Sequence, residues 1–355
     1  MPEQADGVLP PLLSQTGAFK DVRDLVPNES LIPYDVVVPF WSDGATKIRY
    51  ISVPDGKIQF APTSEWIFPR GTVFVKTFAL ATNELDPHSL RRLETRLLVC
   101  DKNGGVYGAV YKWRADNSDA DLLATNLTET IGITTATGVR TQMWYYPSRA
   151  DCLTCHTANA GGVLGVKTRQ LNRDFAYPSG VVDNQLRAWN HVGLFNTNLD
   201  GADWNDFSKL VRPDDLSRSL EDRARSYLDA NCAQCHRPKG TVAYFDARYD
   251  TPLAQQGLIN GPVLIDQRID NSRVIVPNDI WRSILYMRVN TSEAFKMPPL
   301  ARNTIDLQGV KLLREWIESL PGPPVLPPPT ISPNGGNYTK SVEVTLKSEP
   351  GANIH

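Results

Sequence analysis

The sequence predicts an α+β protein of several domains, in which a β-rich, sandwich-like N-terminal domain is followed by mainly helical units. Two patterns indicate this order. Short β-branched and aromatic runs separated by turn residues occupy residues 31–140, and apolar residues recur at helical spacing further along the chain. A length of 355 residues exceeds one ordinary domain and suggests two or three. Residues 1–30 precede these patterns and are interpreted as an N-terminal extension.

Within residues 31–140, strand-like runs flank two turn sequences, Pro54-Asp55-Gly56 and Asn103-Gly104-Gly105, and each indicates a β-hairpin. The run from Thr72 to Leu80 has apolar side chains at both odd and even positions, which predicts a central strand covered on both faces. Cys100 lies in a strand pattern and is expected to be a buried, small apolar residue. We expect these strands to form a small sandwich.

Two Cys-x-x-Cys-His motifs follow, from Cys152 to His156 and from Cys232 to His236. With 5 Cys and 5 His in 355 residues, one such match is expected by chance with a probability of roughly one in a thousand. Two thiols three residues apart can each add to a vinyl group of one porphyrin, and the next imidazole can then bind its iron. We therefore expect two covalently bound haem c groups, held by Cys152 and Cys155 and by Cys232 and Cys235, with His156 and His236 as proximal iron ligands.

Two other uses of these cysteines agree less well with their setting. Two Cys-x-x-Cys pairs could bind one zinc ion, but the usual gap between such pairs is about 15–20 residues, and zinc does not require a histidine after both pairs. A Cys-x-x-Cys pair that forms a redox disulfide normally lies at the start of a helix that follows a strand in a βαβ unit. The sequence predicts no βαβ unit around either motif.

Residues 215–320 have the pattern of a helical domain around the second motif. Apolar residues at helical spacing lead directly into Cys232, a middle helix is predicted over residues 277–289, and a final helix begins near Asp306, a candidate N-cap. Met297 lies between the last two helices in Met-Pro-Pro. A methionine is usually a core residue, but in this context its thioether is expected to be the sixth ligand of the second iron.

The first motif lies in a different setting, residues 141–214. Pro147 leaves no room for a long helix before Cys152, so the first haem is expected to pack against the β-rich domain. A helix is predicted over residues 182–194, and His191 projects nearly opposite its apolar face. The candidates for the sixth ligand of the first iron, against an open position, are His191, ranked first, Met143 and His88.

Residues 215–320 resemble a class I cytochrome c domain, a fold of three to five helices around one haem. The longer stretch over roughly residues 10–320 is similar to a family of bacterial di-haem c-type cytochromes. The segments that carry this resemblance are Phe40 to Ala45, Trp66 to Gly71, Leu93 to Arg96, Tyr146 to Arg149, Cys152 to His156 and Leu171-Asn172. Members of this family are sometimes fused to pyrroloquinoline-quinone sugar dehydrogenase domains, so the resemblance implies a role as an electron acceptor.

Several functions are compatible with these motifs. Because His/Met ligation raises a reduction potential, the second haem is expected to be the better acceptor in an electron-transfer module that takes electrons from a dehydrogenase and passes them to another redox protein. The alternative is a di-haem peroxidase or oxidase that uses an open position at the first haem. A third interpretation makes the β-rich domain a polysaccharide-binding part, with the haems delivering electrons to a partner enzyme.

Charge and hydropathy restrict the possible partners and location. A net charge of -2 and a pI near 6.2 provide no basic footprint for nucleic acid, and no 18-residue apolar run could span a membrane. Residues 1–30 lack the features of a signal peptide. Haem attachment to this motif takes place after export in bacteria, so we expect a periplasmic or extracellular protein from which a leader, or a larger upstream portion, has been removed.

The composition changes after Leu320. Residues 321–333 contain seven prolines, which indicates a stiff linker. Residues 334–355, with alternating Val342, Val344 and Leu346, resemble the first strand of a chitobiase-type β-sandwich module. Because one strand cannot fold alone, the chain is expected to continue into a further domain.

Overall fold

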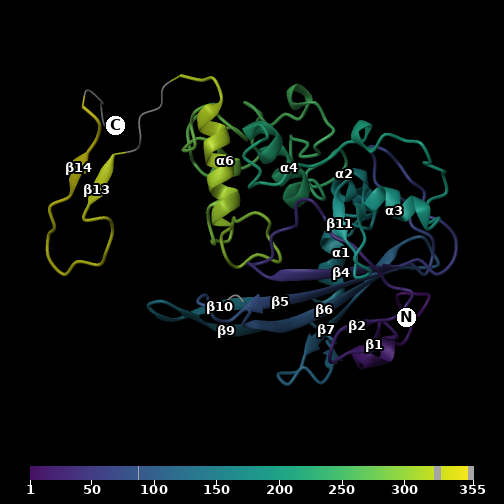
Figure 1. The fold of residues 1–355 in the computed structure, drawn as a ribbon. Helices are drawn as coiled ribbons and strands as arrows, with labels where there is room; N and C mark the ends of the chain where they lie inside the picture. The colour runs from purple at the N-terminus through teal and green to yellow at the C-terminus, as the bar shows by residue number, and fades with distance from the viewer. Residues whose placement is uncertain (87, 324–328, 351–355) are drawn as a thin grey trace.

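The computed structural model describes residues 1–86, 88–323 and 329–350. Its largest element is a six-stranded antiparallel sheet with the strand order β3-β4-β5-β6-β7-β8, in which each strand pairs with its neighbour in the sequence (Figure 1). The strands are β3 Ile32–Pro33, β4 Thr46–Ser52, β5 Val73–Ala81, β6 Leu90–Cys100, β7 Val106–Trp113 and β8 Ala120–Leu122.

Both faces of strand β5 are covered, as the sequence predicts. Val75 packs with apolar residues of β6 and β7 and with Leu13 and Phe19 of the N-terminal segment. That segment contains η1 Leu13–Thr16, β1 Phe19–Asp21 and β2 Val26–Pro27, and it lies below the sheet in Figure 1. Phe74 and Phe78 point to the opposite face because side chains alternate along a strand, and helices α1 to α3 lie on that side. The predicted burial of Cys100 is also confirmed, since the residue is 7% exposed.

The predicted sandwich is not formed by the described residues. The remaining long strands, β9 Leu127–Thr135 and β10 Gly138–Tyr146, form a separate hairpin, and Ile131 and Trp144 of this hairpin pack on Phe78 and Leu80 at one end of the sheet. A sandwich would require a second sheet to cover the rest of the sheet face that carries Phe78. Helices and loops of residues 149–200 pack there instead, because their apolar side chains share a core with β4 and β5.

The prediction of mainly helical domains after residue 140 is wrong. The described residues contain six α-helices, most of them short, and the segments between them are largely coil. The helices are α1 Arg149–Cys155, α2 Thr168–Leu171, α3 Gln185–His191, α4 Leu220–Cys232, α5 Ile284–Val289 and α6 Leu307–Ser319. The other short elements of this part are η2 Ala158–Ala160, β11 Asp174–Ala176, β12 Val182–Asn184, η3 Trp204–Asp206 and η4 Leu253–Gln255.

Turn conformations explain why two predicted helices are shorter than expected. Asn278 has a φ of 60°, and the Asp279 carboxylate accepts hydrogen bonds from the backbone N–H groups of Trp281 and Arg282, so the helix predicted from residue 277 begins only at Ile284. In the region of residues 182–194, β12 pairs with β11, and the Asn184 side chain caps α3. That helix therefore begins at Gln185.

Helices α4, α5 and α6 enclose one apolar core, which includes Leu228, Leu313 and Trp316. The predicted N-cap of the last helix is confirmed, since the Asp306 side chain accepts a hydrogen bond from the backbone N–H of Gly309 at 3.0 Å. A Cβ atom on Gly309 would lie 2.4 Å from the Tyr227 ring, so α6 can cross α4 closely only because this residue has no side chain.

Two short strands, β13 Thr330–Ser332 and β14 Thr345–Lys347, pair near the C-terminus, where their side chains are exposed. Parts of the predicted linker and of the predicted module, residues 324–328 and 351–355, lie outside the described residues. No helix in the described ranges is both long enough and apolar enough to cross a membrane.

Candidate functional sites

The first motif lies on α1, which packs against the sheet. Ser148 and Asp151 form a capping box: the Ser148 Oγ accepts from the Asp151 backbone N–H at 3.2 Å, and the Asp151 carboxylate accepts from the Ser148 backbone N–H at 2.8 Å. Cys152 lies against Gly108 of β7, where a Cβ atom would be 2.8 Å from the Cys152 Sγ. The absence of a side chain at residue 108 therefore makes room for this thiol.

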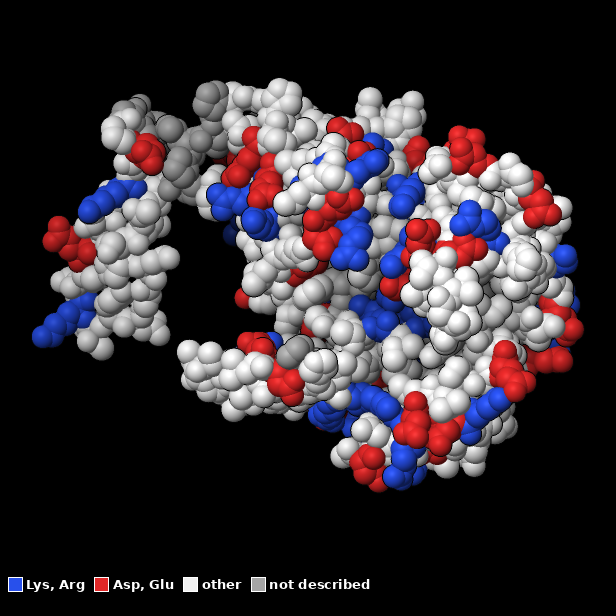
Figure 2. Space-filling view, viewed as in Figure 1, with Lys and Arg blue, Asp and Glu red and all other residues white. Residues whose placement is uncertain are grey.

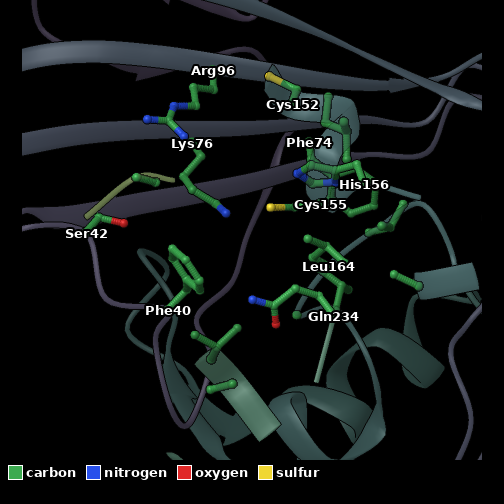
Figure 3. Close-up of a pocket in the computed structure, with 18 of the residues that line it drawn as sticks. Phe40, Ser42, Phe74, Lys76, Arg96, Cys152, Cys155, His156, Leu164 and Gln234 are labelled. Carbon is green, nitrogen blue, oxygen red and sulfur yellow. The ribbon is translucent and has the colours of Figure 1, made fainter. Parts of the chain in front are cut away.

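Cys152, Cys155 and His156 line a cavity between the sheet and α4, which we call cavity 1 (Figure 3). Its empty volume is about 1590 Å³, measured out to its open mouth. Its other walls come from β4 to β6, from segments of residues 34–42 and 160–170, and from α4 with the residues that follow it.

The His156 ring is held in an orientation suited to metal binding. Its Nδ1 lies 2.7 Å from the Gly162 carbonyl oxygen, and donation of the Nδ1 proton to that oxygen leaves Nε2 with a free lone pair. Burial lowers the pKa of His156 to about 4, so the imidazole is neutral at pH 7. Most metal-bound histidines are neutral and donate their other ring N–H to a carbonyl or carboxylate.

The second motif begins at Cys232, the last residue of α4, and borders a different cavity, which we call cavity 2. Its empty volume, with the open solvent at its mouth, is about 810 Å³. Cys232, His236 and Met297 all line it. The structure thus brings Met297 to the same cavity as a histidine 61 positions earlier in the sequence. Its remaining walls are mostly apolar, and two of these side chains, Val242 and Tyr244, are 80% and 56% exposed.

The His236 ring stacks on Phe245, with the ring centroids 4.2 Å apart, and burial lowers the pKa of His236 to about 4. Its Nδ1 is buried and has no hydrogen-bond partner among the described residues. Leaving such a buried polar atom unpaired costs about 1–3 kcal/mol. The His236 ring is thus held by its stacking on Phe245 and, unlike the His156 ring, has no hydrogen bond from Nδ1 to a described residue.

Cavities 1 and 2 lie on either side of the end of α4. Gln234, inside the second motif, points into cavity 1, while Cys232 and His236 line cavity 2 (Figure 3). Cys235 lies beside Cys155, and the interaction of the two thiols lowers the pKa of Cys235. The two motifs therefore touch through one cysteine of each.

The loops that follow the two motifs are also hydrogen-bonded to each other. The Asn159 side chain donates to the Pro238 carbonyl oxygen at 3.2 Å, and Arg237 donates to the Asn159 carbonyl oxygen at 3.2 Å. The spacing of the motifs in the sequence contains no sign of this contact, because it depends on how α1 and α4 pack.

A buried ionic cluster holds α4 in this position. Asp229, one turn before Cys232, pairs with Arg169 at 2.8 Å and with Lys167 at 3.3 Å. Glu65 pairs with Lys167 at 3.4 Å and with Arg237 at 2.8 Å. Burial by itself would raise the pKa of Asp229, but Lys167 and Arg169 lower it to about 2. Sequence reasoning missed this cluster because its members are far apart along the chain.

The segment from Trp41 to Asp43, which the sequence presents mainly as a turn, docks on the chain that follows Met297. The Asp43 carboxylate accepts from the backbone N–H groups of Asn303 and Thr304 at 2.7 and 2.8 Å. The Trp41 indole donates to the Thr304 carbonyl oxygen at 3.1 Å. Asp43 is 4% exposed, so the segment joins the β-rich part to the loop that carries Met297.

The three candidates for the sixth ligand of the first iron lie away from cavity 1. His191 is exposed at the end of α3, Met143 is 53% exposed on β10, and His88 is exposed between β5 and β6. Of the described residues that line cavity 1, His156 is the only histidine and none is a methionine.

Within the described part of the chain, no group of three or more His, Cys, Asp or Glu side chains is placed to hold a metal ion by itself. Comparison of the chain with protein-family models, curated proteins and solved structures finds no match.

Proposed function

We propose that this chain is a di-haem c-type cytochrome that transfers electrons, with one covalently bound haem c at each cavity. The observation that supports this function is that Cys152, Cys155 and His156 line cavity 1, that Cys232 and His236 line cavity 2, and that the two cavities lie on either side of the end of α4. Each cysteine S–H would add across one vinyl group, with the sulfur bonding to one carbon and the hydrogen to the other, so attachment requires no oxidant.

At the first site, Cys152 and Cys155 would hold the porphyrin, and His156 would bind its iron through Nε2. When bound, haem c supplies a one-electron Fe(III)/Fe(II) couple at each site. The hydrogen bond from His156 to Gly162 fixes the ring, so the nitrogen that would bind iron does not rotate away from the cavity.

At the second site, Cys232 and Cys235 would hold the porphyrin, and His236 and Met297 would be the ligands of its iron. The Met297 backbone N–H donates to the Arg288 carbonyl oxygen at 2.8 Å, which fixes the start of the Met-Pro-Pro segment. Thioether ligation raises the reduction potential, so this site would be the better electron acceptor of the two.

Electrons would enter at the first site from a dehydrogenase or a carrier protein and leave from the second site to a cytochrome or oxidase. Cys155 of the first motif and Cys235 of the second lie beside each other, which would give electrons a short route between the two sites. The protein would act in the periplasm or outside the cell, where haem is attached to this motif.

The test is the number of haems on protein matured with the bacterial export-side haem-attachment machinery. Intact mass should show two haems on the unmodified chain and one on each paired variant, Cys152→Ala/Cys155→Ala and Cys232→Ala/Cys235→Ala. The matched control is Cys100→Ala, which removes a buried cysteine outside both motifs and should keep two haems. An unmodified chain that leaves this pathway without haem would refute the proposal.

The second candidate function is a di-haem peroxidase or oxidase. The observation that favours it is the make-up of cavity 1, where the described lining residues include no second imidazole and no thioether opposite His156. The two functions differ in the oxidised protein: a high-spin electron paramagnetic resonance signal together with peroxide turnover would support the enzyme, and low-spin signals without turnover would support electron transfer.

A further inference from the structure

Three cations form a row across the part of the sheet that faces cavity 1. The strand register places Arg49 of β4 opposite Lys76 of β5, and Lys76 opposite Arg96 of β6. All three side chains line the cavity, and Figure 3 shows Lys76 and Arg96 reaching into it. In Figure 2, blue side chains are visible in the hollow between the sheet and the helices. Like charges on directly opposite residues destabilise a sheet, so this row requires anions to offset it.

Two of the three cations have an anion within the protein. Arg49 pairs with Asp35 at 2.6 Å, and Arg96 pairs with Glu94 at 2.6 Å. For the ammonium group of Lys76, the described residues provide neither a hydrogen-bond acceptor nor an ion pair. The middle position of the row is therefore an amine without an anion, and burial together with the charges of Arg49 and Arg96 lowers the pKa of Lys76 to about 7. An anion bound beside it would stabilise its protonated, positively charged form.

The other lysines of cavity 1 are satisfied. Lys47, on the same face of the sheet, donates to the Phe40 carbonyl oxygen at 2.8 Å and to the Ala45 carbonyl oxygen at 3.4 Å. Lys167 pairs with Glu65 and Asp229 in the buried cluster. Lys76 is thus distinguished from its neighbours by its free ammonium group.

The row lies at a suitable place relative to the first motif. Phe74, Leu98 and Gly108 form the adjacent row of the sheet, and Gly108 contacts Cys152. Lys76 lies two strands from Gly108 and two residues further along the sheet. The two backbone positions are therefore separated by about 10 Å across the strands and about 7 Å along them. A porphyrin joined to Cys152 at its vinyl edge has its two propionate carboxylates at the opposite edge of the ring.

We propose that the row of Arg49, Lys76 and Arg96 is a carboxylate-binding site, in which Lys76 binds a propionate of the haem held by the first motif. This inference rests on the proposed function and assigns to the first site a recognition element that the attachment motif does not contain. Cavity 2 has no such row, since Arg288 is the only charged side chain among the described residues that line it, and its guanidinium donates to the Phe295 carbonyl oxygen.

The experiment uses the haem-loaded full chain and two substitutions, Lys76→Met, which keeps the length of the side chain but removes its charge, and Lys76→Arg, which keeps the charge. The control is Lys311→Met on α6, where the side chain is 76% exposed. The readouts are the haem count by intact mass, the two reduction potentials, and the propionate bending bands in the resonance Raman spectrum.

In Lys76→Met, we expect one haem to favour its ferric form about tenfold more, because a positive charge beside the more positive oxidation state is removed. This is a decrease of about 59 mV for a one-electron couple. The propionate bands should shift in Lys76→Met and return in Lys76→Arg, and Lys311→Met should change nothing. Loss of the first haem from Lys76→Met but not from Lys76→Arg also supports the site.

If the Lys76→Met protein carries two haems and its propionate bands and reduction potentials are unchanged, the carboxylate-binding site is refuted, while the proposed function still holds. A change from low-spin to high-spin iron in Lys76→Met would also overturn it, because Lys76 would then be an iron ligand. Loss of the first haem from both Lys76 variants would assign the residue to the folding of the cavity. If the unmodified chain carries no haem on the first motif, the proposed function itself fails.

Discussion

Asp229→Asn is the substitution whose effect on stability the structure defines most closely. The side chain of Asp229 is fully buried and is paired with Arg169 and Lys167. Asparagine has nearly the same shape and keeps an oxygen that can accept from a backbone N–H, so the substitution removes mainly the negative charge. Each cation keeps a second carboxylate, Asp250 for Arg169 at 2.6 Å and Glu65 for Lys167 at 3.4 Å.

Removing one partner of a buried ion pair lowers the free energy of unfolding by about 3–5 kcal/mol. Because Asp250 and Glu65 still compensate the two cations, we expect Asp229→Asn to lower it by about 3 kcal/mol at pH 7. The pH-dependent part follows from the pKa of Asp229, which is about 2 in the folded protein against an ordinary 3.8. This difference corresponds to about 2 kcal/mol in the free energy of unfolding. A lowered folded-state pKa stabilises the protein above pH 4, and that stability is lost as the pH falls towards 2. At pH 3, about 1 kcal/mol of this pH-dependent stabilisation by Asp229 should be lost.

The assay is urea unfolding of the unmodified protein and Asp229→Asn at pH 7 and pH 3, with equal haem content checked by mass. Asp214→Asn is the matched control, because Asp214 is also paired with an arginine, at 2.8 Å, but about half of its side chain is exposed. Exposed pairs contribute about 0–1 kcal/mol. An Asp229→Asn effect no larger than that of the control, or one that is the same at both pH values, would show that the cluster does not hold a buried charge.

Two further predictions concern the sites themselves. Met297→Ala should abolish the weak near-infrared sulfur-to-iron absorption band and lower the potential of one haem while leaving the other nearly unchanged; persistence of the band would place the ligand elsewhere. In a Cys152→Ala/Cys232→Ala chain produced without haem, mild oxidation with diamide should join Cys155 to Cys235, because these two thiols are in contact. Peptide mapping without reduction identifies the disulfide, and its absence would contradict the packing of α1 against α4.

Several features of this protein follow from short stretches of sequence. The two Cys-x-x-Cys-His motifs each fit within five residues, so their chemistry can be recognised without knowledge of the fold. The N-cap at Asp306 and the two-sided burial of β5 are confirmed for the same reason, since a cap and an alternating strand depend on near neighbours. The pairing of Met297 with the second motif was also predicted, and both line cavity 2.

The tertiary structure alone decides how much of the chain is helical. Helices of four to seven residues such as α2 and α3 are not stable by themselves. The N-cap at Asn184 and the turn at Asn278 also make two helices begin later than the periodic segments of the sequence predict. Propensity averaged over a window cannot locate such turns, because one capping side chain or one positive φ determines where a helix begins.

The tertiary structure also decides how the two motifs relate to each other. Three features join residues that are 20 to 80 positions apart. They are the proximity of Cys155 and Cys235, the pairing of Asp229 with Arg169, and the row of cations around Lys76. Local sequence determines which chemical groups are present. Their distances arise from strand register and from the packing of α4 on the sheet domain, which depend on the burial of apolar surface contributed by the whole chain.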